Sequence, residues 1–459
     1  MNHSNMWRAG MLLLFGLWML PSERVLASVT LESSFSVREM YTDNLFFDDK
    51  NKKSDFGTLV GPNFSLRFEN PDIVIGATYM GRVSLFINNS DANRYNQRFN
   101  ILLDLPFLNK QYKKLTVTID ESMNFTPQLD AFSLSGAQDA STSFGGRGGF
   151  GSQVGGGGSS GGGGSSGGGG SSGGGGFGAQ GVGGTQGVFT NRASSFLNRA
   201  GVTFVYAWSP RLNPTLRYGN QYRHFFTSGF QDSLRHTGTL SLRYGVTEQT
   251  TISPSYSYRQ TDFLGKSTQS TSADKIFSHR IQLRISYNFT PSLTGSIRGG
   301  TSFTKQTSAQ EFNGGATTNL SNKWQANPIA GARLTKTYRN GSISLNARSN
   351  IGSGGGLASQ ATRTRRITGS IRHALSFRLN AFASVGYAQN KSTGNGTALD
   401  TKTYRIQSGV SYAFLPWLSG NLSYSHIEQR SSGSAARDIR VNQVFLGLTA
   451  FADPWVWFR

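Results

Sequence analysis

The chain has 459 residues, of which 58 are glycine and none is cysteine, and 36% of its residues are hydrophobic. The absence of cysteine excludes thiol chemistry and cysteine-ligated metal sites. The formal net charge is +21, but the basic residues are spread along the chain and do not form a patch with interleaved aromatic residues, which argues against nucleic-acid binding.

Residues 1–27 have the features of a secretory signal peptide. Arg8 precedes the apolar run Met11 to Leu20, and Val25-Leu26-Ala27 supplies small residues where a signal peptidase cuts. An apolar run of about ten residues is only half the length that a transmembrane helix needs. We therefore expect export through a cleaved signal peptide, with a mature chain that begins near Ser28.

After the signal, apolar and polar residues alternate repeatedly. In the segment Arg280 to Gly299, for example, Ile281, Leu283 and Ile285 alternate with polar residues until Thr290-Pro291-Ser292 turns the chain. A period of two indicates a β-strand with one apolar and one polar face. The pattern predicts eighteen strands, over residues 30–40, 56–68, 73–87, 94–105, 112–125, 191–208, 213–226, 233–245, 249–262, 274–289, 292–305, 322–337, 341–351, 362–377, 379–390, 401–414, 417–430 and 437–451.

The connections between these strands differ in length at the two ends. Tight turns follow the even-numbered strands, as at Asn70-Pro71-Asp72 and Arg339-Asn340-Gly341, whereas long polar loops follow the odd-numbered strands, as at Tyr41 to Asp55 and Gln306 to Ser321. A soluble β-sandwich or β-helix explains the alternation but not this asymmetry. The pattern predicts an all-β fold over residues 28–459: a transmembrane antiparallel up-and-down β-barrel of about eighteen strands, with short periplasmic turns and long extracellular loops.

One connection is an insertion over residues 128–190. It contains three GGGGSS units between Gly155 and Ser172, a composition that cannot bury enough surface to fold and behaves as a flexible coil. Because the insertion follows an odd-numbered strand, we expect it on the extracellular side. A surface tether, a plug folded into the barrel and repeat expansion in a tolerant loop are the three interpretations.

The polar faces of the predicted strands carry basic residues. If the apolar faces contact lipid, ten arginines point into the barrel: Arg217, Arg223, Arg243, Arg259, Arg284, Arg298, Arg333, Arg348, Arg372 and Arg405. Asp104 and Asp120 are the main strand carboxylates that could neutralise them. Arginines around a water-filled pore favour anions. The alternative is that several of them lie at the outer rim, where they bridge lipopolysaccharide phosphates or pair with acids of the loops.

Aromatic residues lie near the ends of several predicted strands, where the two membrane interfaces of a barrel carry aromatic girdles. The examples are Tyr206, Trp208, Phe225, Phe226, Tyr287, Phe289, Tyr412, Phe414 and Trp417. Signals of an enzyme are weak: the six histidines are scattered without metal-ligand spacing, and the G-x-S-x-G spacing occurs only inside the GGGGSS repeats, not as a nucleophile elbow between a strand and a helix. We expect no enzymatic activity, no metal and no cofactor.

The start of the mature chain resembles a known family. Tyr41-Thr42-Asp43-Asn44-Leu45-Phe46, followed by Lys53-Ser54-Asp55-Phe56 and Gly61-Pro62, is similar to the N-terminal signature of Gram-negative outer-membrane β-barrels associated with the PEP-CTERM/exosortase system and of related porin-type barrels. The resemblance implies an outer-membrane location and a link to exopolysaccharide production or export. In such barrels the chain commonly ends on an aromatic residue of the last strand, whereas here Phe458 is followed by Arg459.

Taken together, these features predict a passive outer-membrane channel or export-associated porin with a basic lumen. Its expected partners are outer-membrane lipid and lipopolysaccharide, the barrel-insertion machinery, and anionic solutes or polysaccharide. The alternative from another class is a structural or surface-display barrel whose long loops bind polysaccharide or protein partners.

Overall fold

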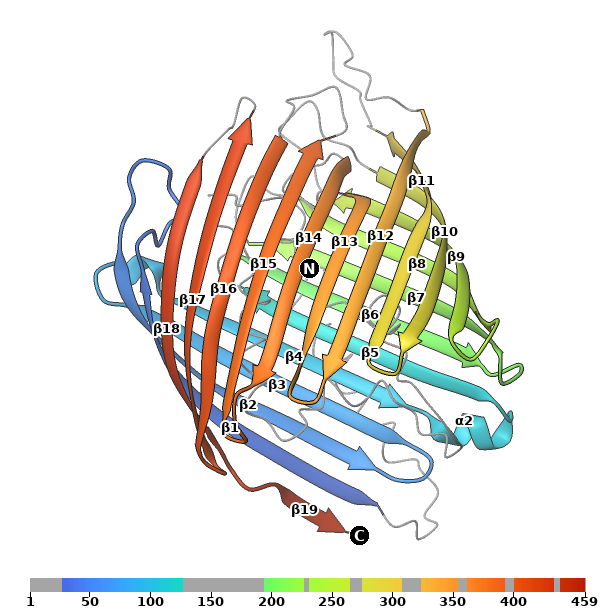
Figure 1. The fold of residues 1–459 in the computed structure, drawn as a ribbon, viewed down its shortest axis with the longest axis horizontal. Coiled ribbons are helices and arrows are strands. Elements are labelled where there is room, and N and C mark those ends of the chain that lie inside the picture. The colour runs from blue at the N-terminus through green and yellow to red at the C-terminus, as the bar shows by residue number, and fades with distance from the viewer. Residues whose placement is uncertain are drawn as a thin grey trace.

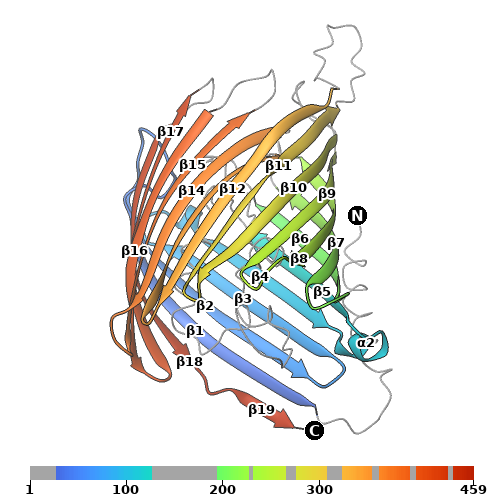
Figure 2. The same ribbon diagram turned by 45° about the vertical axis from the view of Figure 1, so that its right-hand side comes forward.

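The computed structural model describes residues 27–126, 194–226, 231–264, 275–307, 323–353, 361–392, 400–432 and 438–458. The predicted signal peptide and the glycine-rich insertion at 128–190 lie outside these residues, apart from residue 27. In the described part of the chain, long antiparallel strands form a single closed sheet (Figures 1 and 2). None of the helices in that part is long and apolar enough to cross a membrane.

Eighteen long strands build the barrel wall in chain order. They are β1 Ser28–Thr42, β2 Asp55–Glu69, β3 Val74–Phe86, β4 Arg94–Asp104, β5 Leu115–Thr126, β6 Ser195–Tyr206, β7 Leu212–Phe225, β8 Asp232–Gly245, β9 Thr250–Leu264, β10 Lys275–Thr290, β11 Leu293–Thr307, β12 Gln325–Tyr338, β13 Gly341–Ser353, β14 Ala361–Ala374, β15 Leu379–Ser392, β16 Asp400–Leu415, β17 Leu418–Ser432 and β18 Ile439–Phe451. The predicted all-β barrel with eighteen strands is confirmed, and most predicted boundaries lie within three residues of the observed ones.

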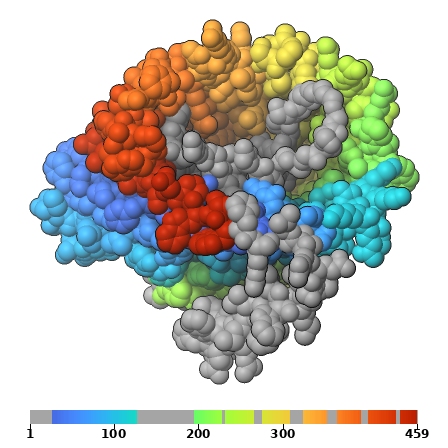
Figure 3. Space-filling view, turned by 90° about the horizontal axis from the view of Figure 1, so that it is seen from below, coloured from blue at the N-terminus to red at the C-terminus, as the bar shows by residue number. Residues whose placement is uncertain are grey.

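The barrel closes where the last long strand meets the first. β1 pairs with β18 from Ser34 opposite Phe451 to Thr42 opposite Gln443, and it pairs with β2 over its whole length. Seen from below, the coloured elements form a ring in which red meets blue (Figure 3). Closure leaves no unpaired sheet edge among the long strands, so their backbone groups find partners within the wall.

The two ends of the barrel differ as the sequence predicts, except that the connection after β4, residues 105–114, is longer than the one after β3, residues 87–93. At one end, here called the short-turn end, β10 and β11 are separated only by residues 291–292, and β16 and β17 only by residues 416–417. The connections at the opposite, long-loop end include residues 43–54 and 308–324. Two short helices interrupt the connections: α2 Pro106–Gln111, between β4 and β5, and the 3₁₀ turn η2 Ser90–Ala92, between β3 and β4.

The C-terminal residues form a feature that the strand pattern did not predict. After β18, the short strand β19 Trp455–Phe458 pairs with the start of β1, from Leu31 opposite Trp455 to Ser28 opposite Phe458 (Figure 1). The register of β1 shifts by one residue between β18 and β19, because Ser34 faces Phe451 while Ser28 faces Phe458. β19 therefore continues the pairing of β18 with β1 after an irregularity at residues 452–454. The pairing of β1 with β18 and β19 is here called the closing seam, and Phe458 belongs to it.

The outer face of the barrel is apolar around its middle. Large exposed side chains such as Leu240, Ile281, Ile297 and Leu446 are 55–60% exposed, and each occupies the alternate position that faces away from the barrel interior. Aromatic side chains follow at the short-turn end: Tyr206, Trp208, Tyr244, Tyr287, Phe289, Phe377, Tyr412, Phe414, Trp417, Trp455 and Trp457 are all exposed. An apolar belt with an aromatic girdle is typical of a barrel that contacts lipid.

One residue of the predicted girdle lies on the other face. Phe225 is only 6% exposed, because it shares the inward-facing positions of β7 with Gln221 and Arg223. The guanidinium carbon of Arg223 lies 5.9 Å from the centroid of its ring. Its neighbour Phe226 is 56% exposed, so of this pair only Phe226 remains on the outside.

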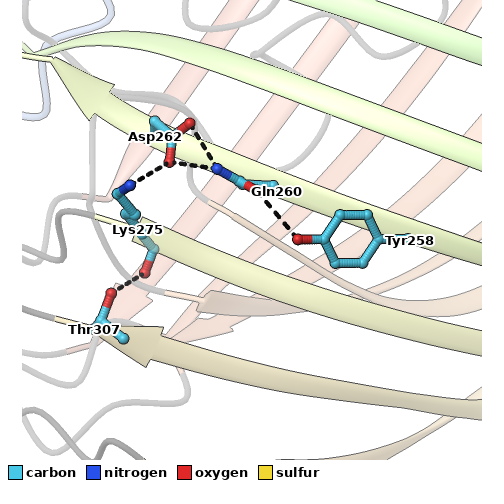
Figure 4. A network of polar contacts seen from close by, with 5 residues as sticks. All are labelled: Tyr258, Gln260, Asp262, Lys275 and Thr307. Atoms are coloured by element: carbon cyan, nitrogen blue, oxygen red, sulfur yellow. Dashed lines mark hydrogen bonds and ion pairs between the residues drawn. The ribbon is translucent and has the colours of Figure 1, made fainter.

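The outer face becomes polar toward the long-loop end. On β9, the Tyr258 hydroxyl donates to Oε1 of Gln260, and Nε2 of Gln260 donates to both carboxylate oxygens of Asp262 at 3.1 and 3.0 Å. Lys275 of β10 lies 3.8 Å from the same carboxylate, and Thr307 of β11 donates to the Lys275 carbonyl (Figure 4). Polar groups that bond along and across strands in this way mark where the apolar belt ends.

Two adjacent glycines of β11 allow a matched test of the strand packing. A Cβ at Gly300 would collide with the carbonyl oxygen of Ile281 on β10, whereas a Cβ at Gly299 would meet nothing within 4 Å. We predict that Gly300→Ala forces β10 and β11 apart locally and lowers the temperature at which the purified barrel loses its compact form on unheated SDS gels. Gly299→Ala is the control and should migrate as wild type, and equal melting of the two variants would contradict the close approach.

Candidate functional site

The inner face of the barrel is defined by the positions that alternate with the exposed apolar side chains. On β10, Ile281 and Leu283 are 57% and 44% exposed, while the alternate residues Gln282 and Arg284 are half-buried. On β7, Leu216 and Tyr218 are exposed, while Gln221 and Arg223 are buried. Because successive side chains of a strand point to opposite faces, this parity assigns every strand residue to the inside or the outside.

All ten arginines predicted from the sequence occupy inward-facing positions. Cross-strand pairing supports the assignment, since Arg284 faces Arg298 and Arg348 faces Arg366 in the ladder. Arg223 is the most buried of the ten, at 2% exposed, whereas Arg243 and Arg372 are exposed. Whether these arginines act on permeating solutes remains a prediction.

The same parity places further arginines on the inner face that the sequence reasoning did not name. They are Arg38, Arg67, Arg82, Arg94, Arg98, Arg199, Arg235, Arg280 and Arg366. The alternation that found the first ten also holds for these residues, so the signal was present in the sequence. From β6 to β10 the additions make the inner wall continuous in arginine, since Arg199, Arg235 and Arg280 join Arg223 and Arg259.

Neutral side chains orient many of these guanidinium groups. Nε of Arg199 donates to Oε1 of Gln221 at 3.2 Å, and Nε of Arg235 donates to the Thr261 hydroxyl at 3.2 Å. Nη2 of Arg280 donates to the backbone carbonyl of Ile351 at 3.1 Å. Amides, hydroxyls and carbonyls fix the position of a guanidinium without cancelling its charge, so the positive field of the wall persists.

Carboxylates on the inner face are few, and several of them already have partners. Of the two predicted from the sequence, Asp120 forms an ion pair with Arg217 at 3.3 Å, and Asp104 accepts a hydrogen bond from the Thr118 hydroxyl at 2.6 Å. Glu69 pairs with Arg67 at 2.7 Å. The described strands β10 to β15 contain no aspartate or glutamate at all, so this half of the wall has no strand carboxylate to balance its arginines.

Lysine is confined to the outer face of the described strands, whereas arginine lies on both faces, as the outward-facing pair of Lys402 with Arg430 shows. The five lysines of the described strands occupy outward-facing positions: Lys275, Lys305, Lys336, Lys391 and Lys402. None of the inward-facing positions in these strands holds a lysine. The basic character of the inner face therefore comes from guanidinium groups alone, which stay charged at any physiological pH and bind carboxylates through two parallel hydrogen bonds.

A second part of the inner face is apolar. Near the long-loop end, inward-facing residues of β1, β2, β3, β17 and β18 form two small buried clusters, here called the mouth clusters. Their members are Met40, Leu45, Leu59, Phe86, Ala92 and Phe445 in one, with Phe46 packed against it, and Ile427, Ile439 and Val441 in the other, with Phe47 packed against it. Because Leu45, Phe46 and Phe47 belong to the β1–β2 loop, that loop folds against the inner face of the wall.

Asp43 and Asn44 fasten this loop to the closing seam. Asn442 of β18 donates from its backbone and side-chain nitrogens to the two carboxylate oxygens of Asp43, at 2.8 and 2.6 Å. Asn44 is fully buried, and its Nδ2 donates to the carbonyls of Asp48 at 2.7 Å and of Arg440 at 3.1 Å. Asp43, Asn44, Leu45 and Phe46 belong to the Tyr41 to Phe46 segment described above. This segment therefore holds the β1–β2 loop in place at the barrel mouth.

The sequence reasoning missed the mouth clusters. The sequence does contain a signal for them: the apolar triplet Leu45-Phe46-Phe47 lies inside an otherwise polar loop. A loop that is fully exposed to solvent does not need three large apolar side chains in a row. No group of three or more histidine, aspartate or glutamate side chains in the described residues is arranged to hold a metal ion.

Comparison with solved structures finds barrels of similar architecture. Two are Pseudomonas aeruginosa proteins: OccK11 (OpdR), with a TM-score of 0.42, 12% identity and coverage of 92% of this chain and 96% of that one, and OccK2 (OpdF), with a TM-score of 0.43, 11% identity and coverage of 92% and 98%. A third is the FrpB iron transporter from Neisseria meningitidis, with a TM-score of 0.42, 9% identity and coverage of 88% and 62%. No family model and no curated protein matches the sequence. The similarity concerns the barrel fold alone.

The fastening of the β1–β2 loop can be tested by limited proteolysis. Asn44→Ala removes the three hydrogen bonds of a buried side chain, and we expect a local loss of about 1–3 kcal/mol for each buried partner left unsatisfied. Trypsin should then cut faster after Lys50, Lys52 and Lys53, while the barrel itself keeps its heat-modifiable migration. Asp49→Ala is the matched control, since Asp49 is exposed and bonds only to the neighbouring Lys50 nitrogen. Equal cleavage rates in the two variants would show that Asn44 does not hold the loop.

Proposed function

We propose that this protein is a passive channel of the Gram-negative outer membrane whose basic lumen favours small anionic solutes. The observation that carries the proposal is the inner wall from β6 to β16, where inward-facing arginines are held by neutral acceptors and meet few carboxylates. Such a wall raises the local concentration of anions and lowers that of cations. The channel works by electrostatics and pore dimensions and breaks no bonds.

The outer-membrane location is supported by the exterior of the barrel. An apolar middle, an aromatic girdle at the short-turn end and a polar band at the long-loop end match the layers of a bilayer and its interfaces. On this proposal the short turns are periplasmic and the long loops extracellular. Residues 1–27 direct export, the insertion machinery assembles the barrel, and outward basic residues near the long-loop end contact lipopolysaccharide.

The resemblance of the Tyr41 to Phe46 segment to barrels associated with PEP-CTERM systems leads us to place the channel alongside exopolysaccharide production or export. What supports this step is the similarity of the signature itself, from Tyr41 to Phe46 and on to Gly61-Pro62.

The proposal predicts anion selectivity that depends on salt. In planar bilayers with a KCl gradient, the reversal potential should show chloride preferred over potassium, more strongly near 0.1 M than near 1 M, because the screening length falls from about 10 Å to about 3 Å. Replacing Arg259, Arg280 and Arg333 together by glutamine should lower the chloride preference several-fold. The control replaces the outward-facing Lys275, Lys305 and Lys336 by glutamine and should leave it unchanged. Equal selectivity of the two triple variants would contradict a basic lumen.

A second candidate function is surface display, favoured by the size of the loops at one end and by the GGGGSS repeats of the insertion. Deleting Gly155 to Gly176 separates the candidates. Loss of cell adhesion to immobilised polysaccharide with unchanged conductance supports display, whereas raised conductance indicates that the insertion obstructs the channel. Unchanged adhesion would count against the display function.

A further inference from the structure

Four arginines of the inner wall lie in one cross-strand row. Arg284 of β10 faces Arg298 of β11, which faces Gly331 of β12. Gly331 in turn faces Arg348 of β13, which faces Arg366 of β14. All four arginines occupy inward-facing positions and are half-buried, so the lumen can reach their guanidinium groups. This set of five residues is here called the arginine row.

Like charges directly opposite each other weaken a pair of strands, and the arginine row contains two such pairs, Arg284 with Arg298 and Arg348 with Arg366. Elsewhere in the wall an arginine next to a strand carboxylate forms an ion pair, as Arg217 does with Asp120. The strands of the row contain no carboxylate. The row is therefore arranged for something other than the stability of the sheet.

Gly331 brings the two halves of the row together. A Cβ at this position would lie 2.6 Å from Nε and 3.2 Å from Cγ of Arg298, so the Arg298 side chain lies across the bare backbone of β12. In that position it lies near enough to both Arg284 and Arg348 for their charges to interact with its own. Any side chain at residue 331 would have to displace Arg298.

We propose that the arginine row is a binding station for a linear polyanion that carries carboxylates at regular intervals, such as an acidic oligosaccharide. Neighbouring strands are about 4.8 Å apart, a spacing close to the length of one hexose unit in an extended chain. Each planar guanidinium can hold one carboxylate through two parallel hydrogen bonds. Because Arg298 lies across the bare backbone at Gly331, it connects the two arginine pairs of the row.

This inference rests on the proposed anion channel, since the ligand must enter the lumen to reach the row. It adds a property that charge alone does not give. A general positive field attracts any anion in proportion to its charge. A row with fixed spacing binds a chain of carboxylates more tightly than a single carboxylate, and it needs the planar fork of arginine, which lysine lacks.

The test uses the full-length barrel in planar bilayers with tetragalacturonate as the probe. We expect resolved blockades of the chloride current by tetragalacturonate, much briefer ones by monogalacturonate and none by neutral maltotetraose. Gly331→Ala should shorten the blockades several-fold without changing anion selectivity, because every charge remains. The control is Gly386→Ala, also inward-facing, where the nearest atom to an added Cβ is at an ordinary 3.6 Å, and its blockades should last as long as in wild type.

Arg298→Lys provides a second variant that keeps the charge and loses the planar fork. It should shorten the tetragalacturonate blockades, as Gly331→Ala does. Blockades of equal length in wild type and Arg298→Lys, or equal blockade by maltotetraose, would overturn the station while leaving the anion channel intact. A wild-type barrel without chloride preference would instead overturn the proposed function itself, so the two failures are distinguishable.

Discussion

The structure depends on the closure of one hydrogen-bonded ladder. β1 pairs with β2 on one side and with β18 and then β19 on the other, so no long strand is left as an edge. A sheet whose apolar face points outward cannot satisfy a free edge with water once it lies in a bilayer. Closure also fixes an inside and an outside for every strand, and from that point the two-residue period decides where each side chain goes.

The consequence is a protein with little apolar core. Buried apolar side chains gather mainly in the mouth clusters, where the β1–β2 loop covers the inner wall, and in the pair Phe263 and Ile276. Most large apolar side chains are exposed on the outer face instead. The ladder and the surrounding lipid must therefore supply the stability that a hydrophobic core supplies in a soluble domain.

This organisation explains what could be predicted from the sequence. Strands such as β10 and β11 were predictable because a period of two survives in each strand separately, and tight turns such as residues 291–292 mark where one strand reverses into the next. The inward direction of Arg284 and Arg298 follows from the same period. The alternation carries this information locally, so no knowledge of neighbouring strands is needed.

Register between strands is different, because it is set by the turns, the stagger of the whole barrel and its closure. The position of Gly331 between Arg298 and Arg348 is a property of three strands together, and no single strand reveals it. β19 was missed for a related reason, since residues 452–454 interrupt the alternation and only pairing with β1 shows that the strand resumes. The packing of Leu45 to Phe47 depends on β17 and β18, nearly 400 residues further along the chain.

The confinement of lysine to the outer face of the described strands shows how the two faces use positive charge. A flexible, strongly hydrated ammonium suits the outer rim, where it extends along the wall toward water and lipid head groups. A guanidinium is planar and more weakly hydrated, so Gln221 and Thr261 can hold Arg199 and Arg235 in place while other donors still face the lumen. Arg298→Lys and Lys305→Arg would both preserve net charge, yet only the first changes the inner wall, because a lumen that acts through oriented donors depends on their geometry as well as on their number.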